Sequence, residues 1–182
     1  MALAPGSNGE EDLVERAGRG RDHAAFEALF HRYRDHAYGL ALRLAGDPVD
    51  AEEIVVEAFA AAWAGLPRFD GRAAFRTWLH AILLNRSRER RRAARRRRRR
   101  IVSVADPEAW ERAVDAAFPG TRIDVERALA ALPERARETA LLRHASGLSY
   151  AEIADAMDVT IGTVKSQLAR AYALMREKLS DA

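Results

Sequence analysis

The chain has 182 residues, a net charge of +3 and 48% hydrophobic residues, which suits one domain or two small ones. It contains no cysteine, which excludes disulfides and a cysteine nucleophile and fits a reducing cytoplasm. It contains no uncharged apolar run of about 18 residues and no N-terminal signal-peptide pattern. We therefore expect a soluble, cytoplasmic protein with no membrane insertion.

Positive charge is concentrated in one window. Residues 86–100 contain eleven arginines and one glutamate, a net +10, so the rest of the chain carries −7. Such a run is often a solvated, self-repelling segment, and alone it is an ambiguous sign of nucleic-acid binding. Next to a DNA-binding motif, it favours contact with nucleic acid.

The N-terminal half predicts a tail followed by three helices. Residues 1–21 mix glycine, proline, serine and acidic groups, which indicates a flexible tail with helical character near Leu13 and Val14. Helices are then expected from Asp22 to the C-cap Gly46, from the Asp47-Pro48 start to Gly65, and from beyond Gly71 into the arginines. Their apolar positions recur at helical spacing: Phe26, Leu29, Phe30, Tyr33, Ala37, Leu40, Ala41 and Leu44, then Ile54, Val55, Ala58, Phe59, Ala62 and Trp63, then Phe75, Trp78, Leu79, Ile82 and Leu83.

Helical periodicity fails after Arg100, where Asp106-Pro107 and Pro119-Gly120 flank one possible short helix around Trp110. A second helical unit begins near Asp124 and continues with a helix started by Pro133. No pair of segments alternates with a period of two. The sequence therefore predicts an all-α protein: two small helical domains joined by a flexible linker.

The most informative segment is 147–166, which predicts a helix, a tight turn and a second helix. Ser149 and Glu152 form a capping box at the first helix. Asp158 stands in the turn, where glycine would enter the left-handed region most easily, and Thr160 can cap the second helix. The second helix carries a polar arc of the kind that a recognition helix presents to DNA: Lys165, Ser166, Gln167 and Arg170. The alternative is an ordinary helical hairpin with a solvated basic face.

These units, in this order, resemble RNA polymerase sigma factors of the sigma-70 family, of the short extracytoplasmic-function (ECF) type, over about residues 22–179. The motifs that carry the resemblance are 50–55 with Glu57 and Phe59, 75–85, 131–135, 147–154 and 162–166. The resemblance implies sigma region 2 at 22–94, an Arg-rich linker at 95–122 and sigma region 4 at 123–182. It further implies binding to core RNA polymerase and promoter DNA, promoter melting, no catalysis and no cofactor or metal.

The resemblance also assigns site residues. The polymerase-binding set is Asp50, Glu52, Glu53, Val56 and Glu57. Glu53 replaces a usual Asp, and Val56 stands where the family usually has Gln. The set for the minus-10 element is Trp78, Asn85, Arg86, Arg88 and Arg91. There an amide could read a flipped base and arginines could hold the backbone. Trp78 is either a stacking platform or, as we favour, a core residue.

The set for the minus-35 element is Thr163, Lys165, Ser166, Gln167, Ala169 and Arg170. Lys165 and Arg170 are the first choices, each for a guanine edge or a phosphate. Gln167 replaces a usual Arg, and Ala169 could touch a thymine methyl. The run Arg92 to Arg100 could meet DNA near the minus-10 element. The resemblance also implies an anti-sigma factor as partner.

Three other classes of protein are alternatives to this interpretation. A helix-turn-helix regulator that acts without a sigma role would need a ligand pocket or a dimer seam, for which the N-terminal half shows no pattern. An enzyme is disfavoured because the five histidines have no metal-ligand spacing and no phosphate loop or nucleophile elbow is present. A partner-binding adaptor is the third alternative.

Overall fold

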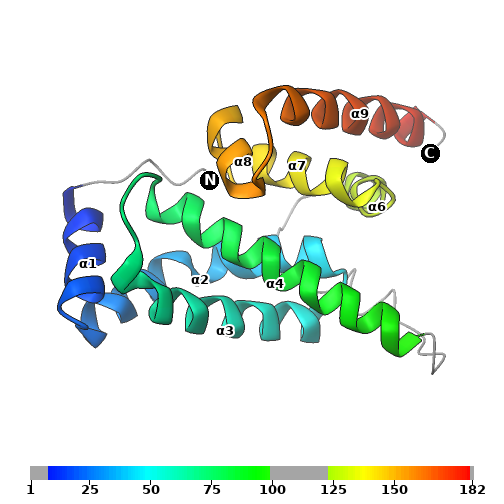
Figure 1. Cartoon of the computed structure of the whole chain (residues 1–182). Coiled ribbons are helices and arrows are strands. Elements are labelled where there is room, and N and C mark those ends of the chain that lie inside the picture. Colours follow the sequence, from blue (N-terminus) through cyan, green and yellow to red (C-terminus); the bar gives the residue numbers. More distant parts are fainter. Residues whose placement is uncertain (1–7, 99–122, 181–182) are drawn as a thin grey trace.

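The computed structural model describes residues 8–98 and 123–180, and this part of the chain contains helices and no strand, which confirms the all-α prediction (Figure 1). In chain order the elements are α1 (Asn8–Arg19), α2 (His23–Ala45), α3 (Pro48–Gly65), the 3-10 helix η1 (Leu66–Arg68), α4 (Phe75–Arg98), α6 (Ile123–Ala130), α7 (Glu134–His144), α8 (Tyr150–Met157) and α9 (Ile161–Ser180). Helices α1–α4 form an N-terminal unit and α6–α9 a C-terminal unit.

Local capping sets the ends of α2 and α3 as predicted. The Asp22 carboxylate accepts backbone N–H groups of the first turn of α2 at 2.9 and 3.1 Å. Gly46 ends the helix in the left-handed region with φ of 76°. Asp47 then caps α3, whose first residue is Pro48. These caps satisfy backbone groups that a helix end leaves without a partner.

The core of the N-terminal unit lies between α2, α3 and α4. Each large apolar side chain that is fully buried contributes about 1.5–3 kcal/mol relative to an exposed one. Those in this unit are Leu29, Leu40, Leu42, Leu44, Ile54, Leu79, Leu83 and Leu84. This packing makes α4 a rigid support whose far end carries the arginines.

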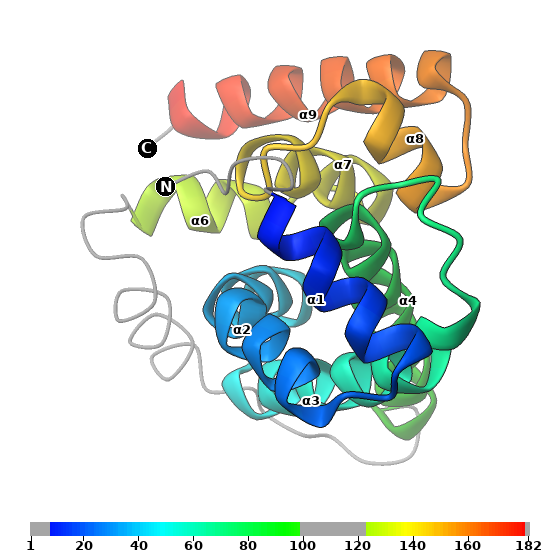
Figure 2. The same cartoon turned by 90° about the vertical axis from the view of Figure 1, so that its left-hand side faces the viewer.

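Helix α1 corrects one sequence prediction. Residues 8–19 are a helix that packs on α2 and η1 (Figure 2), with Ala17 fully buried. The carboxylate of Glu10 is also buried and accepts a hydrogen bond from the Tyr33 hydroxyl. The helical character expected near Leu13 and Val14 is present, but residues 8–19 are not a flexible tail, because a pairing with a residue 23 positions away holds the helix. Residues 1–7 lie outside the described part.

The C-terminal unit packs α6, α7 and α8 against the long helix α9. Leu141, Leu142, Leu148 and Ile153 are fully buried in it. Gly147, with φ of 67°, provides the change of direction before α8. The helix expected from Pro133 is present as α7.

The two units are in contact: α8 lies against α4, and α7 against α2 (Figure 1). The expected linker began at residue 95, but α4 continues as a helix to Arg98. The rest of that segment, with the possible helix near Trp110, lies outside the described residues. Helices α4 and α8 are far apart in the sequence, so their contact could not be predicted from adjacency along the chain.

Candidate nucleic-acid interface

The helix-turn-helix of 147–166 is present with the predicted local chemistry. At the start of α8 the Glu152 backbone N–H donates to the Ser149 hydroxyl at 3.2 Å, and the Ser149 N–H donates to the Glu152 carboxylate at 2.8 Å. Asp158 closes the helix in the left-handed region with φ of 53°. The Thr163 N–H donates to the Thr160 hydroxyl at 3.2 Å at the start of α9. These bonds fix the angle at which α9 leaves the turn.

Helix α9 presents one face to solvent. Val164, Leu168 and Ala171 are buried and anchor the opposite face. The solvent side contains five of the six predicted minus-35 residues, Thr163, Lys165, Ser166, Ala169 and Arg170. Gln167 differs, because it is half-buried and its amide oxygen is buried with no hydrogen-bond partner among the described residues. The exposed side is a cationic and polar surface at the start of a helix, which suits a DNA groove.

The predicted polymerase-binding residues form a strip along α3. Glu52, Glu53, Val56 and Glu57 are exposed, and the Val56 side chain is 68% exposed although it is apolar. Asp50 is half-buried at the start of the strip. The strip is therefore acidic with an apolar centre.

Arg90 of α4 ties this strip together, which sequence reasoning missed. Its guanidinium pairs with Asp50 at 3.1 Å, with Glu57 at 3.0 Å and with Glu53. The three acids have the spacing of one helix face, but the sequence does not say which of the eleven arginines of residues 86–100 reaches them. Arg90 partly neutralises the strip and holds its carboxylates in one row.

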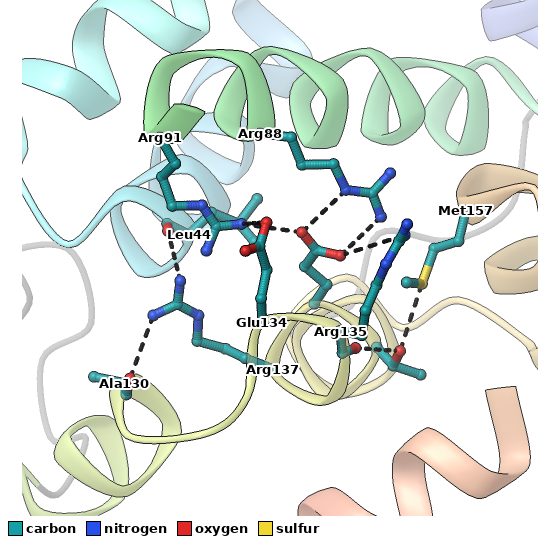
Figure 3. A network of polar contacts seen from close by, with 10 residues as sticks. Leu44, Arg88, Arg91, Ala130, Glu134, Arg135, Arg137 and Met157 are labelled. Atoms are coloured by element: carbon teal, nitrogen blue, oxygen red, sulfur yellow. Dashed lines mark hydrogen bonds and ion pairs between the residues drawn. The ribbon is translucent and has the colours of Figure 1, made fainter. Parts of the chain in front are cut away.

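The predicted minus-10 residues divide into an exposed group and a covered group. Asn85 is exposed, and Arg86 is half-exposed and pairs with Glu89 of the same helix at 2.7 Å. Arg88 and Arg91 point instead at α7 (Figure 3). Both pair with Glu138, and Arg91 also pairs with Glu134.

Trp78 is half-buried in an aromatic group. Its ring centroid lies 4.9 Å from that of Phe69 and 5.9 Å from that of Phe75. A Cβ placed on Gly65 would come within 3.1 Å of the Trp78 ring, so α3 and α4 are in close contact here. The packing agrees with the core interpretation, while the residue remains partly exposed.

Two of the five histidines, His36 and His80, pack together inside the N-terminal unit, while His23, His31 and His144 are exposed. The rings of His36 and His80 lie 5.3 Å apart between α2 and α4. Burial, helped by His36 and Arg76, lowers the pKa of His80 to about 3, so this ring is neutral at pH 7. In residues 8–98 and 123–180 no three histidine, aspartate or glutamate side chains are placed to hold a metal ion.

Comparison with known proteins identifies the family. Residues 29–97 match the family model "Sigma-70 region 2", and residues 122–175 match "Sigma-70, region 4". The chain is 34% identical to the RNA polymerase sigma-H factor of Pseudomonas aeruginosa, over 89% of each chain. It is also 34% identical to the ECF RNA polymerase sigma-E factor of Escherichia coli K12, over 93% of this chain and 94% of that one. The chain belongs to the ECF sigma factors.

Solved structures agree with this assignment. CnrH in complex with the cytosolic domain of CnrY matches this sigma factor with a TM-score of 0.72 at 25% identity, over 96% of this chain and 99% of that one. The sigma factor RpoE of Bartonella quintana, in complex with the anti-sigma factor NepR, matches with a TM-score of 0.68 at 28% identity, over 85% and 96%. Helices α1–α4 thus contain region 2 and α6–α9 region 4. Across the described part of the sigma factor, no helix is both long and apolar enough for a membrane span.

Proposed function

We propose that this sigma factor binds core RNA polymerase in the cytoplasm, directs it to promoters with minus-35 and minus-10 elements and helps to melt them, without catalysis of its own. The observation that carries the proposal is the exposed face of α9. Lys165 and Arg170 lie on it together, on a helix anchored by Val164 and Leu168. A cation can clamp a phosphate or read a guanine edge, and both groups are available in a minus-35 duplex that contains guanine.

For the minus-10 element the proposed reader is Asn85. Its exposed amide offers a donor and an acceptor to the Watson–Crick edge of an unstacked base. Arg86, one residue further on, can hold the adjacent backbone. Trp78, about two turns earlier on α4, is proposed to support the helix through packing, with its exposed part available for stacking.

The proposed polymerase contact is the strip on α3. Glu52, Glu53 and Glu57 offer carboxylates to a basic partner surface, and Val56 offers an apolar centre in place of the usual amide. An exposed valine contributes through burial on binding, at roughly 25 cal/mol per Å² of apolar area. Contact at this position is then hydrophobic and not hydrogen-bonded.

An anti-sigma factor is the proposed regulator. The solved structures described above were determined as complexes, one of them with a protein named as an anti-sigma factor. The match extends over most of this chain, which supports binding of a similar kind of partner. Addition of such a partner is expected to lower holoenzyme formation in a binding assay with core polymerase.

The experiment is transcription from a genomic DNA pool by purified protein and core RNA polymerase, with each component alone as a control. Initiation that depends on the protein, at a shared two-element motif, is the expected result. Asn85→Ala should reduce initiation, while Glu27→Gln, an exposed change on α2, should not. Tight sequence-specific binding by the protein alone, without initiation, would contradict the proposal and favour a regulator with no sigma role.

A further inference from the structure

We infer that the free sigma factor is closed by an ionic latch, in which carboxylates of region 4 occupy arginines of region 2 that bind promoter phosphates in the open form. The inference rests on the proposed sigma function and on the minus-10 role that the family resemblance implies for Arg88 and Arg91. It goes beyond that function because it concerns the state of the chain without DNA or polymerase.

The centre of the latch is Glu138. Its side chain has no exposed surface, and its two oxygens accept from Arg88 as a fork, Nε to Oε1 at 3.1 Å and Nη2 to Oε2 at 2.7 Å. Arg91 Nη2 donates to the same carboxylate at 3.0 Å and to Glu134 at 2.9 Å (Figure 3). The Arg88 and Arg91 side chains are only 13% and 16% exposed. A guanidinium fork recognises carboxylate and phosphate with the same geometry. Glu138 therefore occupies the position that a DNA phosphate would need.

Further polar contacts cross between the units. Arg43 of α2 binds Glu126 of α6 with N–O distances of 2.6, 2.9 and 3.1 Å, and the Glu126 side chain is 2% exposed. The Thr77 hydroxyl of α4 donates to Glu152 of α8 at 3.0 Å. Neither Arg43 nor Glu126 belongs to a DNA-binding or polymerase-binding set. The closed arrangement is thus held at points outside the promoter-binding residues as well.

Distance requires this arrangement to open. The minus-35 and minus-10 elements are about 25 base pairs apart, which is about 85 Å of B-form duplex. Helices α4 and α8 are in direct contact, and a helix of 20 residues such as α9 is about 30 Å long. The two DNA-binding surfaces cannot reach both elements while the latch is closed.

The latch covers arginines of the minus-10 surface but leaves the minus-35 surface on α9 exposed. The face of α9 remains open, with Lys165 and Arg170 exposed, while Arg88 and Arg91 are covered. The closed chain can therefore touch duplex DNA through region 4, whereas at the minus-10 surface Asn85 and Arg86 lack the support of the two covered arginines. Ion pairs suit such a device because desolvation offsets much of their attraction, so a competing phosphate or a polymerase surface can open them.

The test measures opening directly in the full-length chain. Since the sequence has no cysteine, single cysteines at the exposed positions Asp35 on α2 and Glu177 on α9 can carry a fluorescence energy-transfer pair. The variants are Glu138→Gln and Glu126→Gln. The control is Glu15→Gln, which removes the same charge from a pair within α1. Circular dichroism checks folding, and binding of a single-stranded minus-10 oligonucleotide is measured on the same samples.

Both variants should lower energy transfer and bind the oligonucleotide about five- to tenfold more tightly, a modest change because desolvation offsets much of the attraction in a buried ion pair. Glu15→Gln should match the wild type, and core polymerase should lower energy transfer in the wild type. If Glu138→Gln fails to fold, energy transfer and oligonucleotide binding in Glu126→Gln alone test the latch.

Unchanged energy transfer, or lower transfer with unchanged oligonucleotide binding, would overturn the latch. Wild-type initiation with core polymerase in a parallel reaction separates this outcome from a failure of the proposed function, in which no initiation occurs.

Discussion

The hydroxyl of Tyr33 on α2 donates a hydrogen bond of 2.6 Å to the carboxylate of Glu10 on α1. Both side chains are buried, and Arg32 lies 3.3 Å from the same carboxylate. Burial, together with Glu10, raises the pKa of Tyr33, so the phenol remains a donor at neutral pH. This pair attaches the N-terminal helix to region 2.

Tyr33→Phe is expected to lower the free energy of unfolding by about 1–3 kcal/mol, because a buried carboxylate loses a partner. Tyr38→Phe removes the same group from the same helix, where the described residues provide its hydroxyl with no acceptor, and should change stability less. Chemical denaturation of both variants measures the difference. Equal effects would show that α1 is not held by this bond.

The second prediction concerns the loss of folding stability at acidic pH. The pKa of His80 is lowered to about 3 by burial, while an unfolded histidine titrates near about 6.5. Between these pH values the unfolded chain binds a proton that folded His80 does not. The free energy of unfolding therefore has its full value above about pH 6.5 and falls as the pH decreases towards 3. The loss is at most about 1.4 kcal/mol per pH unit. His36, whose pKa is also lowered by burial, adds to this loss.

His80→Phe should reduce the slope of melting temperature against pH between about pH 4 and 6.5. His31→Gln, an exposed change on α2, serves as the control and should retain the wild-type slope. An unchanged slope in the His80 variant would assign the acid sensitivity to other groups, such as carboxylates.

The third prediction separates base reading from phosphate binding on α9. Lys165→Ala and Arg170→Ala are each expected to weaken holoenzyme binding to a minus-35 duplex. A phosphate contact should reduce the salt slope by about 0.9, whereas a base contact should cost about 1–3 kcal/mol and relax sequence preference. Lys178→Ala removes an exposed cation near the end of the same helix. Losses no larger than in this control would remove both residues from the interface.

The fourth prediction concerns the turn of the helix-turn-helix. Asp158 has φ of 53°, a region that costs an ordinary residue about 1–2 kcal/mol and asparagine or aspartate less. Asp158→Val should therefore lower the melting temperature, and Asp158→Gly should not. Thermal unfolding by circular dichroism measures both. Destabilisation by glycine equal to that by valine would point to a role for the carboxylate itself.

The ends of the helices were predictable because capping is local. The bonds of Asp22, Asp47 and Ser149 join groups within three residues of each other, so the amino-acid order alone determines them. The exposed face of α9 was predictable for the same reason, since helical periodicity separates its buried positions from its polar ones. The motif order likewise sufficed to indicate the family.

The state of the basic residues was decided only by the tertiary structure. Within residues 86–100, the structure directs Arg88 and Arg91 to region 4 and Arg90 to α3, yet in the sequence they are three cations of one run. Their partners lie 33 to 50 residues away, so neither propensity nor spacing selects them. Partner choice depends on which helix faces are brought together when the cores close. The sequence by itself thus determined the helices, the DNA-reading motif and the family, and the packing of region 4 on region 2 determined which arginines are available to DNA.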